Sequence, residues 1–192
     1  DGGSVKASVV ADINEAIGEI PSWFVPGHPI AGTEQSGVDA SFSELYKDRR
    51  VILTPLPETD ATAVSRVRAM WEAVGATVSE MDVTHHDEVL AATSHLPHVL
   101  AYTLVESLAR MSEQREIFEY AAGGFRDFTR IASSDPVMWR DICLANGEAV
   151  LNMLERFNRD LASLSEAIRA SDGDRILQVF SEAKSARDGF AG

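Results

Sequence analysis

The sequence predicts an α/β region followed by an all-α region, with the boundary near residue 82. Two observations support this fold class. Before residue 82, short apolar runs end at proline or glycine and flank a helical pattern, as in an open α/β sheet. After it, apolar residues recur every three or four positions to the end of the chain, which is typical of amphipathic helices. We therefore expect two domains, residues 1–82 and 83–192.

The first region contains three short runs with the features of β-strands. Residues 23–25 and 51–54 are apolar, and a proline follows each run. Residues 76–81 alternate between apolar and polar side chains, which is typical of a strand. Between the last two runs, apolar residues have helical spacing from Asp60, a favourable N-cap, to Gly75, a typical helix stop. The pattern predicts a strand–helix–strand unit.

The second region begins with a long predicted helix. Thr84 and Asp87 resemble a capping box at its start, and Pro97 should kink it. The glycine pair at residues 123–124 interrupts the helical pattern. We expect the chain to turn there before the next helix.

Another long helix is predicted after Pro136, with Asp135 as its cap. Its apolar residues follow a heptad spacing, which favours pairing with another helix. The stripe consists of Val150, Leu154, Phe157, Leu161, Leu164 and Ile168. A break at residues 171–173 precedes a last amphipathic helix. We expect these C-terminal helices to form a homodimer, and burial of the stripe inside one chain is the alternative.

Composition excludes several classes of function. The 192 residues are 45% hydrophobic and 24% charged, as in an ordinary globular protein, and contain no run resembling a membrane span or signal peptide. We expect a cytoplasmic protein. With 17 basic and 30 acidic residues, the net charge of −13 repels nucleic acid and anionic lipid, so we expect neither as a partner. The single cysteine, Cys143, excludes an internal disulfide.

His28 is the strongest candidate for chemistry among the five histidines. Pro26, Gly27 and Pro29 surround it in a loop at the end of a predicted strand, where α/β folds bind ligands. A structural role in the turn is the alternative.

The other histidines occur in two pairs. His95 and His98 have a spacing that allows a metal, but no acidic residue clearly completes a site, and we expect no metal. His85 and His86 are expected in a solvated first helical turn.

Two arginines follow the glycine pair at a spacing of four residues. The planar guanidinium groups of Arg126 and Arg130 suit carboxylate recognition. Surface ion pairs are the alternative for both.

These segments together resemble the prephenate and arogenate dehydrogenase family. The similar stretches are residues 1–6 (DGGSVK), 26–34 (PGHPIAGTE), 92–98 (ATSHLPH), 123–132 (GGFRDFTRIA) and 135–139 (DPVMW). Their order runs through most of the chain. The resemblance implies that residues 1–82 are the C-terminal portion of a Rossmann-like NAD(P)-binding domain. It also implies that residues 83–192 form an all-helical domain for substrate binding and dimerisation.

The resemblance implies an NAD- or NADP-dependent oxidative decarboxylation of prephenate to 4-hydroxyphenylpyruvate, or of arogenate to tyrosine. His28 would accept the proton of the ring 4-hydroxyl, a task that suits an imidazole. Ser4 would lie near that hydroxyl and, with Gly27, near the nicotinamide. Arg130 would hold a substrate carboxylate. The remaining pocket residues would be His98 and Ser94 at the pyruvyl end, with Thr33 and Trp139 as further lining residues.

The chain also departs from the family pattern, because the dinucleotide motif G-x-G-x-x-G is absent. We expect a fragment that lacks the first half of the nucleotide-binding domain and that holds a dinucleotide weakly by itself. Two alternative functions stay open. One is a dehydrogenase acting on a β-hydroxy acid, and the other is a non-catalytic helical dimer module.

Overall fold

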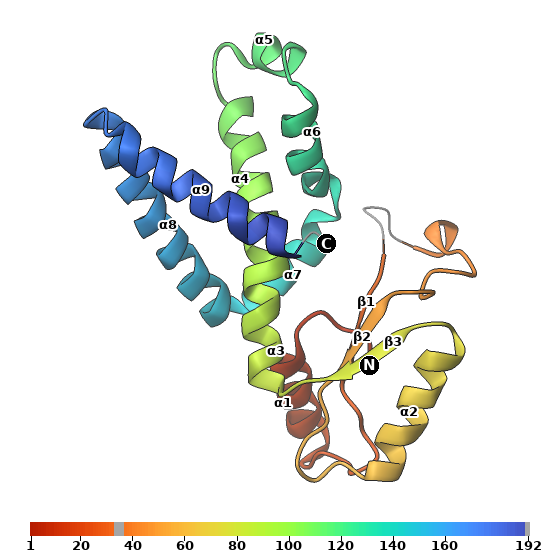
Figure 1. The fold of residues 1–192 in the computed structure, drawn as a ribbon. Helices are drawn as coiled ribbons and strands as arrows, with labels where there is room; N and C mark the ends of the chain where they lie inside the picture. Colours follow the sequence, from red (N-terminus) through yellow and green to blue (C-terminus); the bar gives the residue numbers. More distant parts are fainter. Residues whose placement is uncertain (33–36, 191–192) are drawn as a thin grey trace. The chain divides into compact units, whose positions relative to one another are not determined.

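The computed structural model describes residues 1–32 and 37–190, and the fold statements below concern these residues (Figure 1). By internal contacts the chain divides into two compact units, Asp1–Val150 and Leu151–Gly192. The predicted order, a small sheet followed by helices, is confirmed. The expected domain boundary near residue 82 lies inside the first unit and stays a prediction.

The first unit contains a three-stranded sheet in the order β1-β2-β3. Strand β1 is antiparallel to β2, and β2 is parallel to β3. The strands are β1 (Gly27–Ile30), β2 (Arg50–Leu53) and β3 (Thr77–Glu80). A short 3-10 turn, η1 (Val38–Ala40), precedes β2. Val25, Val51, Leu53 and Ala76 form the buried core of this part of the chain.

Helix α2 (Ala61–Ala73) connects β2 to β3, which confirms the predicted strand–helix–strand unit. The Asp60 carboxylate accepts a hydrogen bond of 2.7 Å from the Thr62 amide, as expected for an N-cap. Gly75 has a φ of +87°, a conformation that side chains rarely adopt. A Cβ there would also lie 3.2 Å from Lys47 Cα, so this helix end requires glycine.

The strand predicted at residues 23–25 is wrong. The Phe24 amide donates to the Pro21 carbonyl at 2.9 Å, which closes a turn, and the Trp23 side chain is 70% exposed. The strand begins instead at Gly27, which pairs with Leu53 of β2. His28, expected in a loop after a strand, therefore lies within β1. Pairing with β2 decides which residues become the strand, and the local apolar run alone could not reveal that partner.

Helix α1 (Lys6–Ile17) was not expected from the sequence, and it packs against α3 (Val83–Leu90). The capping box predicted at Thr84 is also wrong. Asp82 caps α3, and its carboxylate accepts from the amides of Thr84 and His85 at 2.8 and 3.1 Å. Asp87 therefore does not form the predicted capping box with Thr84, and its carboxylate bonds to the start of α1 instead.

Beyond α3 the helical path continues through a π-helical segment, η2 (Ala91–His95), into α4 (Leu96–Ala109). The Leu96 amide donates to the Ala91 carbonyl, five residues earlier. Pro97 has no amide hydrogen, so it cannot continue the ordinary α-helical bonding. The distortion expected at Pro97 thus takes the form of a π segment, a feature frequent at functional sites.

Further helical segments complete the first unit, and α4 contacts α5, α6 and η3. The Asp135 carboxylate caps α7 by accepting from the Val137 amide at 2.7 Å, with Pro136 in the first turn, as predicted. The single long helix predicted from there through the heptad stripe is wrong, because α7 ends at Ala145 and α8 begins at Gly147. The segments are α5 (Gln114–Glu119), α6 (Gly123–Thr129), η3 (Arg130–Ser133) and α7 (Pro136–Ala145).

Most of α8 (Gly147–Arg169) and all of α9 (Gly173–Phe190) belong to the second unit. The heptad stripe of α8 is only partly covered. Val150, at the end of the first unit, is 4% exposed, whereas Leu161 and Ile168 are 49% and 59% exposed. Across the described residues, no helix is both long and apolar enough to cross a bilayer.

Candidate active site

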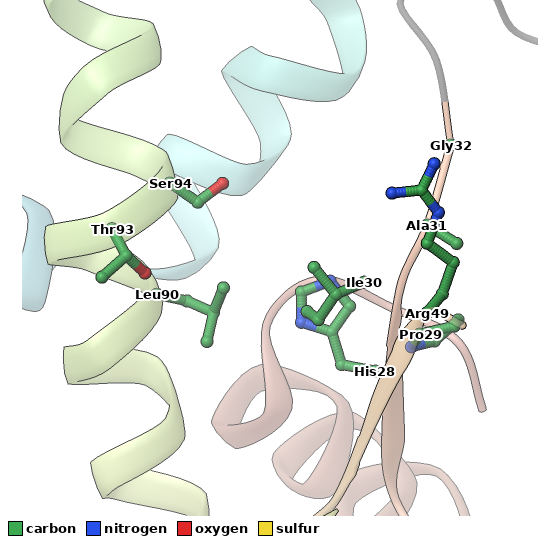
Figure 2. Close-up of a pocket in the computed structure, with 9 residues that line it drawn as sticks. All are labelled: His28, Pro29, Ile30, Ala31, Gly32, Arg49, Leu90, Thr93 and Ser94. Carbon is green, nitrogen blue, oxygen red and sulfur yellow. The ribbon is translucent and has the colours of Figure 1, made fainter. Parts of the chain in front are cut away.

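A cavity of about 510 Å³ lies between the first strand and the α3–η2 segment (Figure 2). Its volume is in the range of small-molecule sites. The strand side contributes His28 and the residues after it, and the helical side contributes Leu90, Thr93 and Ser94. The described lining residues are His28, Pro29, Ile30, Ala31, Gly32, Arg49, Leu90, Thr93 and Ser94.

The His28 side chain projects from β1 toward this cavity (Figure 2). The residue is only 9% exposed, and its Nδ1 lies 3.0 Å from Nε2 of His86. The two rings meet edge to face, with centroids 5.1 Å apart. Because His86 occupies the Nδ1 side, Nε2 is the ring nitrogen that remains for a ligand.

His86 is completely buried, so the solvated turn predicted for it is wrong. Neighbouring His85 is exposed as expected. Successive helical residues point in directions about 100° apart, so His86 shares the buried side of α3 with Leu90 while His85 faces solvent. The Nδ1 atom of His86 lies 2.7 Å from the Oδ1 atom of Asp87.

The Asp87 carboxylate joins this histidine pair to the start of α1. Its two oxygens accept from the amides of Lys6 and Ala7, each at 2.9 Å. Burial alone would raise the pKa of Asp87, but the bonds from His86 and the two amides outweigh it and lower that pKa. The carboxylate therefore stays charged, and it satisfies helix amides that have no partner within α1.

Lys6 ties the same helix to the strand that carries His28. Its fully buried ammonium group donates to the Gly27 carbonyl at 2.7 Å and forms an ion pair with Asp1. Burial lowers the pKa of Lys6 to about 8, against the opposing charge of Asp87. This contact fixes the backbone immediately before His28.

The electrostatic surroundings keep His28 neutral. Burial is the main cause that lowers its pKa to about 3. The nearby groups of His86, Lys6 and His95 act in the same direction, and Asp87 opposes them. At neutral pH the imidazole of His28 is thus an uncharged base beside a cavity.

A second buried histidine extends the polar network. The Asn146 amide nitrogen donates to the Asp87 carbonyl at 2.8 Å and lies 3.1 Å from His95 Nδ1. His95 is 1% exposed, and burial lowers its pKa to about 4. Among the described residues, no group of three or more histidine, cysteine or acidic side chains could hold a metal ion.

His98 has a different environment from His95. Its ring stacks on Trp139, with centroids 3.5 Å apart and an interplanar angle of 16°. Its Nδ1 donates to the Ser94 carbonyl at 2.9 Å. Burial lowers the pKa of His98. The stack links α4 to α7 one helical turn beyond Ser94.

The structure brings together only part of the predicted site. His28 and Ser94 line the cavity, and His98 and Trp139 form a pair beyond Ser94. Like His98 and Trp139, three further predicted residues are not among those that line it.

Of these three, Ser4 is half-buried just before α1, Gly27 lies at the start of β1, and Arg130 is exposed at the start of η3. Gly27 donates its amide to the Asp1 carboxylate at 3.2 Å. Thr33 lies outside the described residues. The roles assigned to all these residues stay predictions.

Sequence reasoning missed several residues of this region. His86 and Asp87 stand beside an exposed histidine with no motif to distinguish them, and Asn146 lies far from both in the sequence. Arg49, which lines the cavity, directly precedes β2, and its place became clear only from the sheet. One signal was available in the sequence. His86 and Leu90 are four residues apart and therefore lie on the same side of a helix, so a buried Leu90 implies a buried His86.

Comparison with known proteins identifies relatives of the whole chain. Residues 1–80 match the family model of the prephenate dehydrogenase nucleotide-binding domain, and residues 82–182 match that of the prephenate dehydrogenase dimerization domain. A cyclohexadienyl dehydrogenase of Zymomonas mobilis is 45% identical over 190 residues, which are 97% of this chain and 64% of the relative. A prephenate dehydrogenase of Bacillus subtilis is 37% identical, over 99% of this chain and 51% of the relative.

Solved structures give the same result. Prephenate dehydrogenase from A. aeolicus, in complex with hydroxyphenyl propionate and NAD+, has a TM-score of 0.88 and 44% identity, covering 98% of this chain and 65% of its own. A Synechocystis arogenate dehydrogenase has a TM-score of 0.83 and 25% identity, covering 99% of this chain and 68% of its own. The chain spans about half to two thirds of the length of the curated relatives above. The two family models together account for most of its residues, and the chain belongs to the prephenate dehydrogenase family.

Proposed function

We propose that the protein containing this chain oxidises prephenate, with loss of carbon dioxide and transfer of hydride to NAD+ or NADP+. The product would be 4-hydroxyphenylpyruvate. The observation that carries this proposal is the neutral, largely buried His28 beside a cavity of ligand size. The relatives named above support the substrate class. The proposal includes a cytoplasmic location.

In this reaction, His28 acts first as a general base and then as a general acid. As the carbon–hydrogen bond at ring C4 breaks, Nε2 of His28 accepts the proton of the 4-hydroxyl, and the C4 oxygen becomes a carbonyl. Loss of the ring carboxylate as carbon dioxide leaves the electron pair in the ring, which becomes a phenolate. His28 then gives the proton back to the phenolate oxygen, so the residue ends as it began.

The substrate carries two carboxylates, and two arginines are candidates to hold them. Arg49 lines the cavity on the strand side. Arg130 begins η3, which packs against the helix that carries His98. A guanidinium group suits a carboxylate because it donates two parallel hydrogen bonds. Ser94 and His98 would contact the pyruvyl end.

The nicotinamide cofactor, when bound, takes up the hydride from C4. The polar residues at the start of α1 and β1 fit the nicotinamide end, where Ser4 and Gly27 would lie close to it. This chain has no G-x-G-x-x-G turn, the feature that binds the pyrophosphate in Rossmann domains. The proposal therefore assigns only the nicotinamide end to the residues present here.

The proposal also includes a homodimer through the C-terminal helices. The family model that covers residues 82–182 is that of a dimerization domain. Large apolar side chains of α8 and α9 are exposed, and leaving each in water costs about 1.5 to 3 kcal/mol. They are Leu151, Leu161, Ile168, Leu177, Phe180 and Phe190. A second copy of the chain would cover part of this surface.

The test is to supply the purified full-length protein with prephenate or arogenate and with NAD+ or NADP+. Reduction of the nicotinamide together with release of carbon dioxide is expected for prephenate. Arogenate is the second candidate, because one relative is a cyclohexadienyl dehydrogenase and one similar structure is an arogenate dehydrogenase. Failure with both substrates, but oxidation of a β-hydroxy acid, would replace the proposed substrate class. A dimer inactive with all three would favour the non-catalytic module.

A further inference from the structure

We propose that His86 is a positioning residue that holds the proton of His28 on Nδ1 and so leaves Nε2 bare toward the cavity. Asp87 anchors this arrangement. The geometry that supports it is the unbroken series of contacts from His28 Nδ1 to His86 Nε2 at 3.0 Å and from His86 Nδ1 to Asp87 Oδ1 at 2.7 Å. The catalytic consequence rests on the proposed function, whereas the position of the proton does not.

The direction of each hydrogen bond follows from its partners. A charged carboxylate only accepts hydrogen bonds, so His86 must carry a proton on Nδ1 to meet Asp87. In the proposed arrangement His86 carries only this proton, so its Nε2 has a lone pair. The short contact with His28 therefore requires that His28 donates from Nδ1. A neutral imidazole has one proton, and Nε2 of His28 is left as the acceptor.

The opposite arrangement would prevent the proposed reaction. If His86 carried protons on both nitrogens, it would donate to Nδ1 of His28, and the single proton of neutral His28 would sit on Nε2. The cavity would then face a donor, which cannot take the hydroxyl proton. Selecting the correct ring tautomer by a third group is the role of the aspartate in serine hydrolase triads.

The anchor of this series is rigid, because Asp87 also accepts from the Lys6 and Ala7 amides at the start of α1. Asp87 is 5% exposed and His86 is fully buried, so the series has no outlet to solvent at this end. Because the proton cannot leave through His86 and Asp87 to solvent, it stays on His28 until it returns to the product. While His28 is protonated, the Asp87 charge two groups away balances it.

The first test locates the proton directly. Nitrogen-15 NMR of the full-length protein, with labelled histidine and no substrate, distinguishes a protonated Nδ1 from a protonated Nε2. We expect His28 to be protonated on Nδ1 near neutral pH. A proton on Nε2 of His28 in the wild type overturns the proposal. This result does not depend on whether prephenate is the substrate.

The second test uses two variants, each of which keeps one of the two hydrogen bonds of the His86 ring. The oxygen of Gln can replace Nε2 and still accept from His28, whereas the amide of Asn can replace Nδ1 and still reach Asp87. We expect His86→Asn to lower kcat for the proposed reaction about 10- to 100-fold with a small change in KM, and His86→Gln to restore most of it. His85→Asn, one residue away and exposed, is the matched control and should leave kcat unchanged.

The outcomes separate positioning from folding. In His86→Asn, the nitrogen-15 signals of His28 should report a mixture of both tautomers. The thermal unfolding midpoint should fall by similar amounts in His86→Asn and His86→Gln. Equal losses of kcat in the Asn and Gln variants, following their losses of stability, would overturn the positioning role. If the Asn variant does not fold, the wild-type tautomer and the activity of His86→Gln still decide. A wild-type protein inactive toward prephenate contradicts the proposed function and leaves the tautomer result valid.

Discussion

The surroundings of His28 and the helices after Val150 distribute polar and apolar groups in opposite ways. In the first region, charged or polar side chains of Lys6, His86 and Asp87 are buried, and each has hydrogen-bond partners. In the second region, apolar side chains are exposed, among them Leu161 at 49% and Ile168 at 59%.

The difference shows that the first region is stabilised by contacts within its own chain, whereas the second region leaves apolar surface that another chain could cover. Burying polar groups is unfavourable unless they are hydrogen-bonded, so the network around His28 persists because its members satisfy one another. Exposed apolar side chains gain stability only when another surface covers them. Substitutions in the first region should therefore change chemistry and pH dependence, and substitutions in the second should change assembly.

The largest effect is expected for His28→Asn. Loss of the proton acceptor should lower kcat by about 10²- to 10⁴-fold with a smaller change in KM, as measured by steady-state kinetics of the full-length enzyme. His85→Asn is the control, because that side chain is exposed. An unchanged kcat would remove His28 from the mechanism.

Leu161→Glu tests whether the exposed apolar side chains of α8 form a dimer interface. If a second chain covers α8, each substituted protomer loses about 1.5 to 3 kcal/mol of apolar burial and places a charge in the interface. Analytical ultracentrifugation should show a shift from dimer to monomer. Ser163→Glu, an exposed position on the same helix, is the control. A wild-type protein that sediments as a monomer at high concentration would contradict the dimer.

Variants of Arg130 and Arg49 test which of the two arginines binds a substrate carboxylate. Arg130→Ala should raise KM for prephenate through loss of a charge-assisted bond worth about 1.5 to 3 kcal/mol, and Lys should restore only part of it. Arg49→Ala is the companion variant, because Arg49 lines the cavity. Unchanged KM in Arg130→Ala together with a raised KM in Arg49→Ala would transfer the carboxylate-binding role to Arg49.

The smallest effect, counted for each histidine and each pH unit, is a pH dependence of stability in the first region. Burial lowers the pKa of His28 to about 3 and of His95 to about 4, whereas both bind protons near pH 6.5 when unfolded. Between these values the unfolded chain binds more protons, so stability falls as the pH falls from about 6.5 toward 4. Each histidine contributes at most about 1.4 kcal/mol per pH unit.

Denaturant unfolding at several pH values measures this dependence. His95→Gln should make it shallower, and His85→Gln, an exposed control, should leave it unchanged. A free energy of unfolding that does not fall below pH 6.5 would mean that these histidines are not held neutral in the folded protein.

Several elements of the fold could be predicted because their determinants are local. Asp60 and Gly75 mark the ends of α2, and Asp135 with Pro136 marks the start of α7, since a cap bonds to amides two or three residues away. The predicted strand at residues 23–25 and the cap at Thr84 failed. The strand failed because pairing with β2, a separate segment, decides where β1 begins. The cap failed for a local reason, because Asp82 and not Thr84 accepts the hydrogen bonds of the first amides of α3.

The order of an α/β region and a helical region followed from the sequence alone, and so did the family. The sequence also led to the prediction that His28 has a catalytic role. Only the tertiary structure revealed what surrounds that histidine. His28 and His86 meet across 58 positions, and the Asp87 carboxylate reaches the Lys6 amide across 81. Local periodicity describes which side of a helix is apolar, but it carries no information about which distant segment will cover that side. Packing of α1 against α3, together with the contact between His28 and His86, turned an ordinary helical turn into a buried hydrogen-bonded network.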